Sequence, residues 1–395
     1  MNKLLVALFI SYSAALPVSA QSNTEKLSPL DFVKGKDPLV DAVLANSERY
    51  RFQWIFTPLT QDSSGRFYPK QTYDYSTNQY FYPASMVKLP TAILTLEKLT
   101  EKAVSLNAVL KINADQICGN MDFMERTQRS SISFETMIEE MISISDNSYY
   151  TSLYHFLTPS VIYDKLTARG LTATKIYKGF SGCELPENLF CNSLSYFDPT
   201  TKIVHTQEYA QLELSSMAAR YNYSSDKLLG SKHEYRNAIV NGPFDFNYNL
   251  EFPLAEIHGT MERLIYPLEF EQYERWNLTH NDRAFLLKTL VQYPREMKNS
   301  RYHDLKKYPD NYYKYIVHGD GNTMYSGVKT YSKIGISYGF VTETALVVDE
   351  TNGKAYLLSA SIYVNANDTV NDGKYEYEEI ARPFFAKLGQ LLLDF

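Results

Sequence analysis

The sequence predicts a mixed α/β protein of the α+β type, with an antiparallel five-stranded sheet flanked by N- and C-terminal helices and extended by a helical lobe. Three observations predict this fold. β-rich runs lie near both ends of the chain, helical apolar spacing precedes the first run and follows the last, and the long middle is mostly helical in pattern. The simplest assembly pairs the runs from the two ends in one sheet that helices cover.

The first elements follow from periodicity. Residues 38–50 have helical apolar spacing with a Pro near the start, where a helix tolerates it. Two β-rich runs, 51–59 and 66–75, flank a polar turn and suggest a hairpin. Residues 85–99 are apolar on most sides of a helix, which is typical of a helix that other elements cover.

The polar cluster of residues 143–147 interrupts a helical pattern that runs from 133 to 156. The pattern therefore predicts two helices, with Asp146 or Asn147 available as the cap of the second. Residues 177–207 contain several Gly, Pro and Asn residues and are expected to form a long irregular surface loop.

Helical segments are expected between residues 208 and 330, for example at 208–221 and 281–293. Three β-rich runs then follow, at 329–340, 342–350 and 354–364, and an amphipathic helix at 377–393 ends the chain.

The first twenty residues have the layout of a cleavable secretory signal. A single Lys3 precedes an apolar run, and a small-x-small pattern ends at Ala20. This predicts a signal peptide at 1–20, cleavage near Ala20, and a secreted or periplasmic catalytic domain at 21–395. No later apolar run approaches the length that spans a bilayer, so no stable membrane insertion is expected.

Composition excludes several functional classes. The net charge of −6 and the 14% aromatic content are ordinary, and no basic stripe suggests nucleic acid as a partner. The seven His show no metal-ligand spacing, so the sequence predicts neither a metal nor another cofactor. We interpret the 33 Tyr as amphipathic packing groups, with a sugar-stacking surface as the alternative. The sequence does not indicate an oligomeric state.

The three cysteines leave at least one thiol unpaired within a monomer. In an oxidising compartment, Cys183 and Cys191 can close a short loop by a disulfide. Three free thiols, including Cys118, are the alternative.

Ser85 and Lys88 form a candidate nucleophile and base. A serine hydroxyl needs a base within reach, and a Lys three residues later lies on the same face of a helical turn. Ser-x-x-Lys also occurs at 224–227 and 326–329, but only Ser85 directly precedes a long apolar helix. There, burial can remove the charge of Lys88, although a Lys that extends to solvent is the alternative.

Two further motifs follow in order. Ser145, Asp146 and Asn147 supply a hydroxyl that can relay a proton and an amide that can hold a substrate carbonyl, or else they form a helix cap. Lys333 and Gly335 lie in a predicted strand, where Lys can attract an anion and Gly can let a substrate approach the backbone.

These three motifs in this order resemble the class A β-lactamases and the wider penicillin-recognising serine enzymes. The likeness covers residues 38–175 and 325–393, whereas the enlarged region at about 200–320 is longer than the family leads us to expect and is mostly unaccounted for by the resemblance. The resemblance implies that Ser85 is the acylated nucleophile, Lys88 its proton acceptor, and Ser145 the proton shuttle to the leaving nitrogen.

The resemblance also implies substrate-binding roles. Asn147 would bind substrate and Lys88, Lys333 would attract a substrate carboxylate, and the backbone N–H groups of Ser85 and Ile336 would form an oxyanion hole. The chain departs from the family at Ile334, where Thr or Ser is usual. Ser337 is the candidate substitute for the missing hydroxyl.

Deacylation in class A enzymes uses a Glu that activates water. Glu184 and Asn188, four residues apart, are similar to the family's loop motif, but Glu187 stands where an apolar residue is usual. Glu184 is the candidate catalytic base, with a solvated loop carboxylate as the alternative.

The predicted function is therefore acyl-serine hydrolysis of a β-lactam or related amide. A peptidoglycan DD-carboxypeptidase or transpeptidase, a non-hydrolysing penicillin-binding sensor and an esterase remain as alternatives, because the acylation machinery is shared. The expected partner is a small β-lactam or peptidoglycan-derived substrate.

Overall fold

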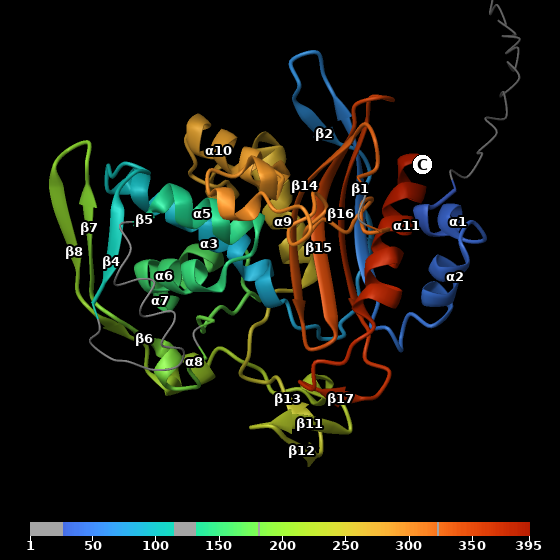
Figure 1. Cartoon of the computed structure of the whole chain (residues 1–395), viewed down its shortest axis with the longest axis horizontal. Coiled ribbons are helices and arrows are strands. Elements are labelled where there is room, and N and C mark those ends of the chain that lie inside the picture. The colour runs from blue at the N-terminus through green and yellow to red at the C-terminus, as the bar shows by residue number, and fades with distance from the viewer. Residues whose placement is uncertain (1–26, 114–131, 181, 322–323) are drawn as a thin grey trace, which may run out of the picture.

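A computed structural model describes residues 27–113, 132–180, 182–321 and 324–395 (Figure 1). The predicted signal peptide and Cys118 lie outside these residues. Within them, the main helices are α1 Pro29–Val33, α2 Pro38–Ala45, α3 Lys88–Glu101, α5 Phe134–Ser143, α6 Asn147–Leu157, α7 Pro159–Thr167, α8 Leu214–Ala218, α9 Leu254–Ile265, α10 His280–Val291 and α11 Arg382–Leu393.

The central sheet has the strand order β14-β15-β16-β1-β2, and β3 also pairs with β1. All of its pairings are antiparallel. Its strands are β1 Gln53–Gln61, β2 Phe67–Pro69, β3 Tyr73–Tyr75, β14 Val328–Ser337, β15 Phe340–Asp349 and β16 Lys354–Tyr363. The sheet therefore joins the two ends of the chain, as predicted.

The predicted count of five strands is wrong, because the second run forms two short strands, β2 and β3. Pro69 ends β2, and a proline has no N–H for further pairing. The chain then resumes pairing with β1 at Tyr73, opposite Phe56.

Helices cover both faces of this sheet (Figure 1). Side chains alternate along a strand, so Trp54 and Phe56 of β1 pack with α1, α2 and α11, whereas Ile55 faces the helical lobe. The mixed α/β class and the flanking N- and C-terminal helices are confirmed.

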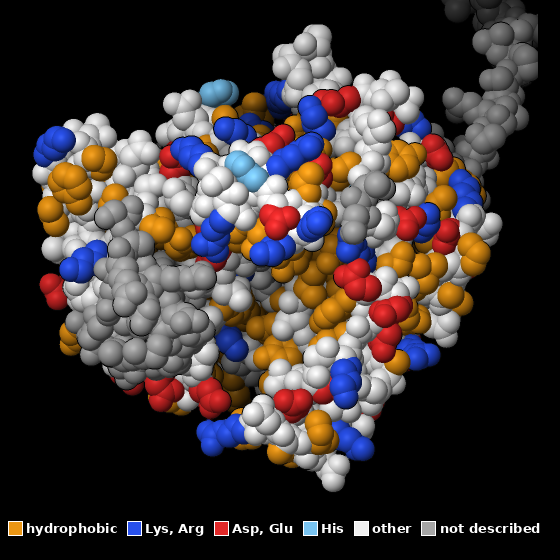
Figure 2. Space-filling view, in the orientation of Figure 1, with side chains coloured by type: hydrophobic (Ala, Val, Ile, Leu, Met, Phe, Trp, Pro, Cys, Tyr) orange, Lys and Arg blue, Asp and Glu red, His pale blue; other side chains and the backbone are white. Residues whose placement is uncertain are grey.

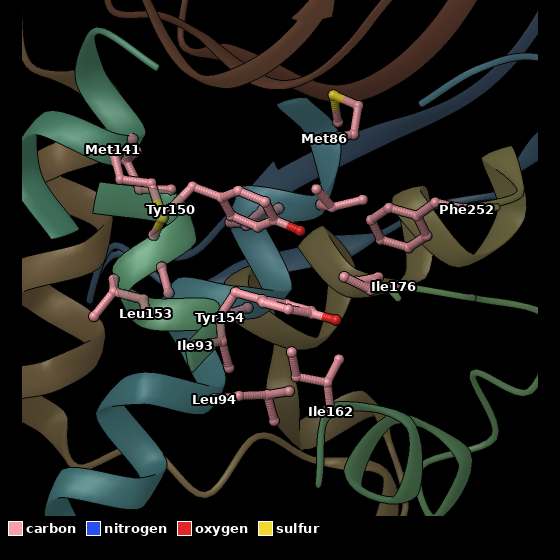
Figure 3. Packing of buried hydrophobic residues seen from close by; sticks show 14 of the residues in the cluster. Met86, Ile93, Leu94, Met141, Tyr150, Leu153, Tyr154, Ile162, Ile176 and Phe252 are labelled. Atoms are coloured by element: carbon pink, nitrogen blue, oxygen red, sulfur yellow. The ribbon is translucent and has the colours of Figure 1, made fainter. Parts of the chain in front are cut away.

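The helical lobe packs around α3 and α6 (Figure 3). Met86, Ile93 and Leu94 pack with Tyr150 and Tyr154 in one buried cluster, and all five residues are at most 2% exposed. The turn that carries Ser85 is therefore fixed directly on the core of the lobe.

Two predictions for the middle of the chain are wrong. The stretch expected to be irregular ends in a hairpin, β7 and β8, which belongs to a small sheet of order β5-β4-β7-β8. The helix expected over 208–221 is reduced to the five residues of α8. The strands here are β4 Val109–Ile112, β5 Ile132–Ser133, β6 Phe190–Cys191, β7 Leu194–Asp198, β8 Ile203–Gln207 and β9 Ala210–Gln211.

Residues 221–250 form a small β-rich unit where helices were expected, below the main sheet in Figure 1. Its strands are β10 Leu228–Leu229, β11 Lys232–Tyr235, β12 Ala238–Asn241 and β13 Phe244–Asp245, and β11 pairs in parallel with β17 Thr369–Val370. Short 3-10 helices and one π-helical turn, Tyr377–Ala381, complete the described chain.

The predicted cysteine states are both wrong. Cys183 is disulfide-bonded, and Cys191 is a free buried thiol. A Cys183–Cys191 bridge and a set of three free thiols are therefore both excluded. Burial raises the pKa of Cys191, because a thiolate is poorly solvated in the core.

None of the helices in the described residues is long and apolar enough to cross a membrane.

Candidate active site

Ser85 lies in a 3-10 turn, Ala84–Val87, that leads directly into α3. Ala84 has a positive φ of 45°, and the Met86 N–H donates to the Pro83 carbonyl at 3.0 Å. Ser85 is half-buried in this sharp turn. Among the described residues its hydroxyl takes part in no hydrogen bond, so it is available to another group.

The strand β14 lies directly against this turn, and Gly335 makes the close approach possible. A Cβ atom on Gly335 would lie 2.2 Å from the Pro83 carbonyl oxygen and 3.0 Å from the amide nitrogens of Ser85 and Met86. Such distances are forbidden, so only Gly fits. Gly335 therefore admits the turn that carries Ser85, and its predicted role in substrate approach stays a prediction.

Lys88 is fully buried at the start of α3. Its ammonium donates to Ser145 Oγ at 3.0 Å, to the Ser145 carbonyl at 2.6 Å and to Asn147 Oδ1 at 2.6 Å. Burial lowers the pKa of Lys88 well below its ordinary value, the charge of Lys333 lowers it further, and Asp146 opposes these effects. Lys88 therefore has access to the neutral form that a proton acceptor requires.

Lys333 approaches the same hydroxyl from the sheet. Its ammonium donates to Ser145 Oγ at 3.1 Å and to the Ile334 carbonyl at 2.8 Å. Burial lowers its pKa to about 7, the Glu343 carboxylate raises it, and Lys314 lowers it. Ser145 thus lies between two lysines that come from different layers of the fold.

The connection between α5 and α6 places Ser145 and Asn147. Ser145 has a positive φ of 60°, and Asp146 caps α6 by accepting the Tyr149 N–H at 2.9 Å. The cap and the catalytic interpretation of this tripeptide are therefore compatible. Asp146 is the cap, while Ser145 and Asn147 bind Lys88.

A cavity of about 720 Å³ opens over this turn and contains several predicted residues. It is lined by Ser85, Asn147, Glu184, Ile336 and Ser337, among others. Figure 2 shows the molecule hollowed above the small β-rich unit, with hydrophobic side chains in the hollow. The volume of the cavity falls within the range typical of sites that bind small molecules.

Ile334 and Ser337 lie on opposite faces of β14. Ile334 is buried in the cluster beneath α11, so it does not face the cavity. Ser337 lines the cavity together with Ser85 and supplies a hydroxyl there. Ser337 therefore stays the candidate substitute for the missing Thr or Ser.

Glu184 lies at the cavity but is exposed to solvent. Its main-chain carbonyl accepts the Asn188 N–H at 3.0 Å, yet in the described residues its carboxylate has neither a hydrogen bond nor an ion pair. Glu184 does interact electrostatically with Lys178. Burial lowers the pKa of Lys178, and the negative charge of Glu184 opposes this effect. Glu184 is therefore near Ser85 but is not bound to Lys88.

The buried Asn188 organises the loop around Glu184. Its Oδ1 accepts the Gly179 N–H at 3.2 Å, and its amide donates to the Cys183 carbonyl. The Tyr154 hydroxyl donates to the Asn188 carbonyl at 2.9 Å. The loop is thus fixed to α6 even though Glu184 itself points to solvent.

Residues 40–212 match the family model described as the β-lactamase enzyme family. This part of the chain is β-lactamase-like. The family region contains the candidates from Ser85 to Glu184, and it ends before Lys333. No curated protein matches the sequence significantly.

Several solved β-lactamases are similar to the chain over most of its length. The TLA-3 extended-spectrum β-lactamase is 13% identical, with 91% of this chain and 98% of that chain covered and a TM-score of 0.46. A β-lactamase from Sphaerobacter thermophilus is 14% identical, with 90% and 95% covered and a TM-score of 0.46. A β-lactamase from Burkholderia vietnamiensis is 12% identical, with 91% and 97% covered and a TM-score of 0.48.

Sequence reasoning missed part of this site. The insertion contributes Tyr221, Tyr235, Phe244 and Tyr248 to the cavity, which we call the aromatic wall. The abundance of Tyr was the available signal, but only the fold brings these four rings beside Ser85. No cluster of three or more potential metal ligands occurs in the residues that the structure describes.

Proposed function

We propose that this protein is a serine hydrolase that opens β-lactams or related amides through an acyl-enzyme on Ser85. The observation that carries the proposal is the buried Lys88, bonded to Ser145 and Asn147, one helical turn from a serine at the floor of a cavity. A buried lysine with a lowered pKa is the base that a serine nucleophile needs.

In the proposed acylation, Ser85 Oγ attacks the amide carbonyl carbon and its proton passes to neutral Lys88. The backbone N–H groups of Ser85 and Ile336 would stabilise the oxyanion, at about 3 kcal/mol per donor. The C–N bond then breaks, and Ser145 gives a proton to the leaving nitrogen and regains one from Lys88. Lys333 would attract the substrate carboxylate, and Ser337 would donate to it.

Deacylation needs a water that attacks the ester on Ser85. Glu184 is the proposed base for that water because it lines the same cavity. Its exposure and its lack of a bond to Lys88 favour a second candidate function, a slow-deacylating penicillin-binding enzyme or sensor of the peptidoglycan carboxypeptidase or transpeptidase kind. Both candidates share the acylation step and differ in the lifetime of the ester.

We also propose export, with cleavage near Ala20, on the basis of the signal-like first twenty residues. Recovery of the processed chain outside the cytoplasm, with its N-terminus sequenced, tests this. A β-lactam or peptidoglycan-derived small molecule is the proposed partner.

Intact-protein mass spectrometry with a penicillin, after seconds and after hours, together with ultraviolet assay of ring opening, tests the function. Rapid ring opening without a lasting adduct supports a β-lactamase. A lasting adduct supports the slow-deacylating alternative. If neither adduct nor turnover occurs, β-lactams are not substrates, and activated esters and wall peptides become the compounds to assay for acyl-serine chemistry.

A further inference from the structure

The insertion is attached directly to the segment that precedes Ser85. Asp226 accepts the Tyr80 N–H and forms an ion pair with Arg51, and the Tyr80 hydroxyl donates to the Leu250 carbonyl at 2.9 Å. The Phe246 ring lies 5.5 Å from the Tyr82 ring. These contacts fix the aromatic wall beside the turn Ala84–Val87, which carries Ser85.

The aromatic wall leaves large ring surfaces uncovered. Tyr248 is 52% exposed and Tyr235 is 46% exposed, although both line the cavity that contains Ser85. Tyr221 supports Tyr248 from the side, with ring centroids 5.7 Å apart at 66°. Neighbouring rings hold these exposed rings in place. They therefore offer flat surfaces to a ligand, and little side-chain conformational entropy is lost on binding.

Polar groups with unused hydrogen-bonding capacity surround these rings. Asp245 accepts from Asn247 only through Oδ1, and Asn249 uses its side-chain Oδ1 for the Leu250 N–H. In the described residues, Asp245 Oδ2 and the two side-chain N–H groups of Asn249 have no hydrogen-bond partner. Asn371 also lines the cavity, and its Oδ1 has none there either.

We infer that the aromatic wall is a saccharide subsite, so that the preferred acyl substrate carries a neutral pyranose residue next to the amide that Ser85 attacks. A pyranose has a C–H face that packs on Tyr248 and a rim of hydroxyl groups that Asp245, Asn249 and Asn371 can bind. An anionic group is disfavoured there because Asp245 is negatively charged. The position next to a reacting amide rests on the proposed function, whereas saccharide binding itself does not.

Calorimetric titration of the Ser85→Ala variant with a β-1,4-linked trimer of N-acetylglucosamine tests the inference. Tyr248→Ala, added to that variant, is expected to weaken binding roughly tenfold, as for a central aromatic contact. Tyr248→Phe keeps the ring face and should bind as the parent does. Tyr273→Ala removes a 69% exposed ring that is not among the cavity residues, and it should change nothing.

Absence of trimer binding, or binding that Tyr248→Ala and Tyr273→Ala affect equally, would overturn the inference. A competition titration in which N-phenylacetylglycine binds the aromatic wall more tightly than the trimer would also overturn it, because an aromatic acyl group would then be the preferred occupant. Acylation of the wild-type chain by penicillin is measured in parallel. Trimer binding through Tyr248 without acylation upholds the subsite and contradicts only the part of the proposed function that names β-lactams as substrates.

Discussion

Lys88 and Lys333 bring two buried ammonium groups to one hydroxyl, Ser145 Oγ, at 3.0 and 3.1 Å. Two like charges so close to each other, away from water, favour loss of a proton from one of them. Burial and the neighbouring charge of Lys333 both lower the pKa of Lys88. In the proposed acylation, Lys88 would therefore be the proton acceptor and Lys333 the cation.

The pH dependence of acylation tests this division. Since the pKa of Lys333 is lowered to about 7, its charge is present below that pH and lost above it. The ratio of second-order acylation rates for a penicillin and for its methyl ester should fall above pH 7, by roughly tenfold or more. Deprotonation of Lys88 affects both substrates and cancels in the ratio. A ratio that does not change with pH would contradict the proposed role of Lys333 in binding the substrate carboxylate.

Gly335→Ala should lower both stability and acylation. The added Cβ would meet the Pro83 carbonyl at 2.2 Å, so the Ser85 turn must move, at a cost of about 1–3 kcal/mol. Gly353→Ala is the comparison, because its surroundings are open and only its positive φ of 65° opposes an added Cβ. Denaturant unfolding measures the stability of both variants, and their rates of acylation by a penicillin are compared with the wild-type rate. Normal acylation in Gly335→Ala would show that β14 does not position the turn.

At the scale of elements, helix α6 positions the loop that contains Glu184. The Tyr150 hydroxyl donates to the Lys178 carbonyl and the Tyr154 hydroxyl to the Asn188 carbonyl, each at 2.9 Å. The Phe180 N–H donates to Thr151 Oγ1 at 2.8 Å. Helix α6 thus holds the loop at three points, Lys178, Phe180 and Asn188.

Tyr154→Phe should loosen this loop. The substitution leaves the buried Asn188 carbonyl without its donor, a loss of about 1–3 kcal/mol. Hydrogen exchange should accelerate over residues 182–190 and remain unchanged in β14 to β16. Tyr163→Phe is a matched control, since the Tyr163 hydroxyl has no hydrogen-bond partner among the described residues. Equal protection in the two variants would argue against this anchoring role of α6.

Elements with long apolar or β-rich runs were predictable, and those that depend on distant partners were not. The strand at Gln53–Gln61 and the helix at Lys88–Glu101 are buried over most of their length, and the runs that such burial requires are visible in the sequence. Strands such as Leu228–Leu229 are only two residues long and exist because Phe244–Asp245 lies beside them. No local pattern predicts such a pairing. For the same reason, the aromatic wall could not be foreseen, whereas the exposure of Glu184 agrees with the alternative of a solvated loop carboxylate.

For the whole molecule, three buried histidines predict sensitivity to acid. Burial lowers the pKa of His258 to about 3, of His318 to about 3 and of His155 to about 4. His258 lies between helix and sheet, 3.0 Å from Thr57 Oγ1 and 2.9 Å from Ser359 Oγ. Each ring is neutral in the folded protein and must be protonated when it unfolds in acid.

The free energy of unfolding should therefore not depend on these histidines above pH 6.5, and it should fall as pH decreases from 6.5 toward 3. At pH 5, His258 alone should lower the free energy of unfolding by about 2 kcal/mol relative to its value above pH 6.5. His258→Asn should flatten the pH dependence, whereas substitution of the exposed His280 by Asn should not. Urea unfolding at several pH values measures this. Identical slopes in the two variants would contradict the assignment of His258.

The two motifs Ser85-x-x-Lys88 and Ser326-x-x-Lys329 are alike in sequence and differ in the fold, because only Lys88 is buried against Ser145 and Asn147. The decisive measurement is peptide mapping of the wild type, Ser85→Ala and Ser326→Ala after brief exposure to a penicillin. We predict an adduct on the Ser85 peptide in the wild type and in Ser326→Ala, and none in Ser85→Ala. An adduct that survives in Ser85→Ala would contradict the proposed nucleophile.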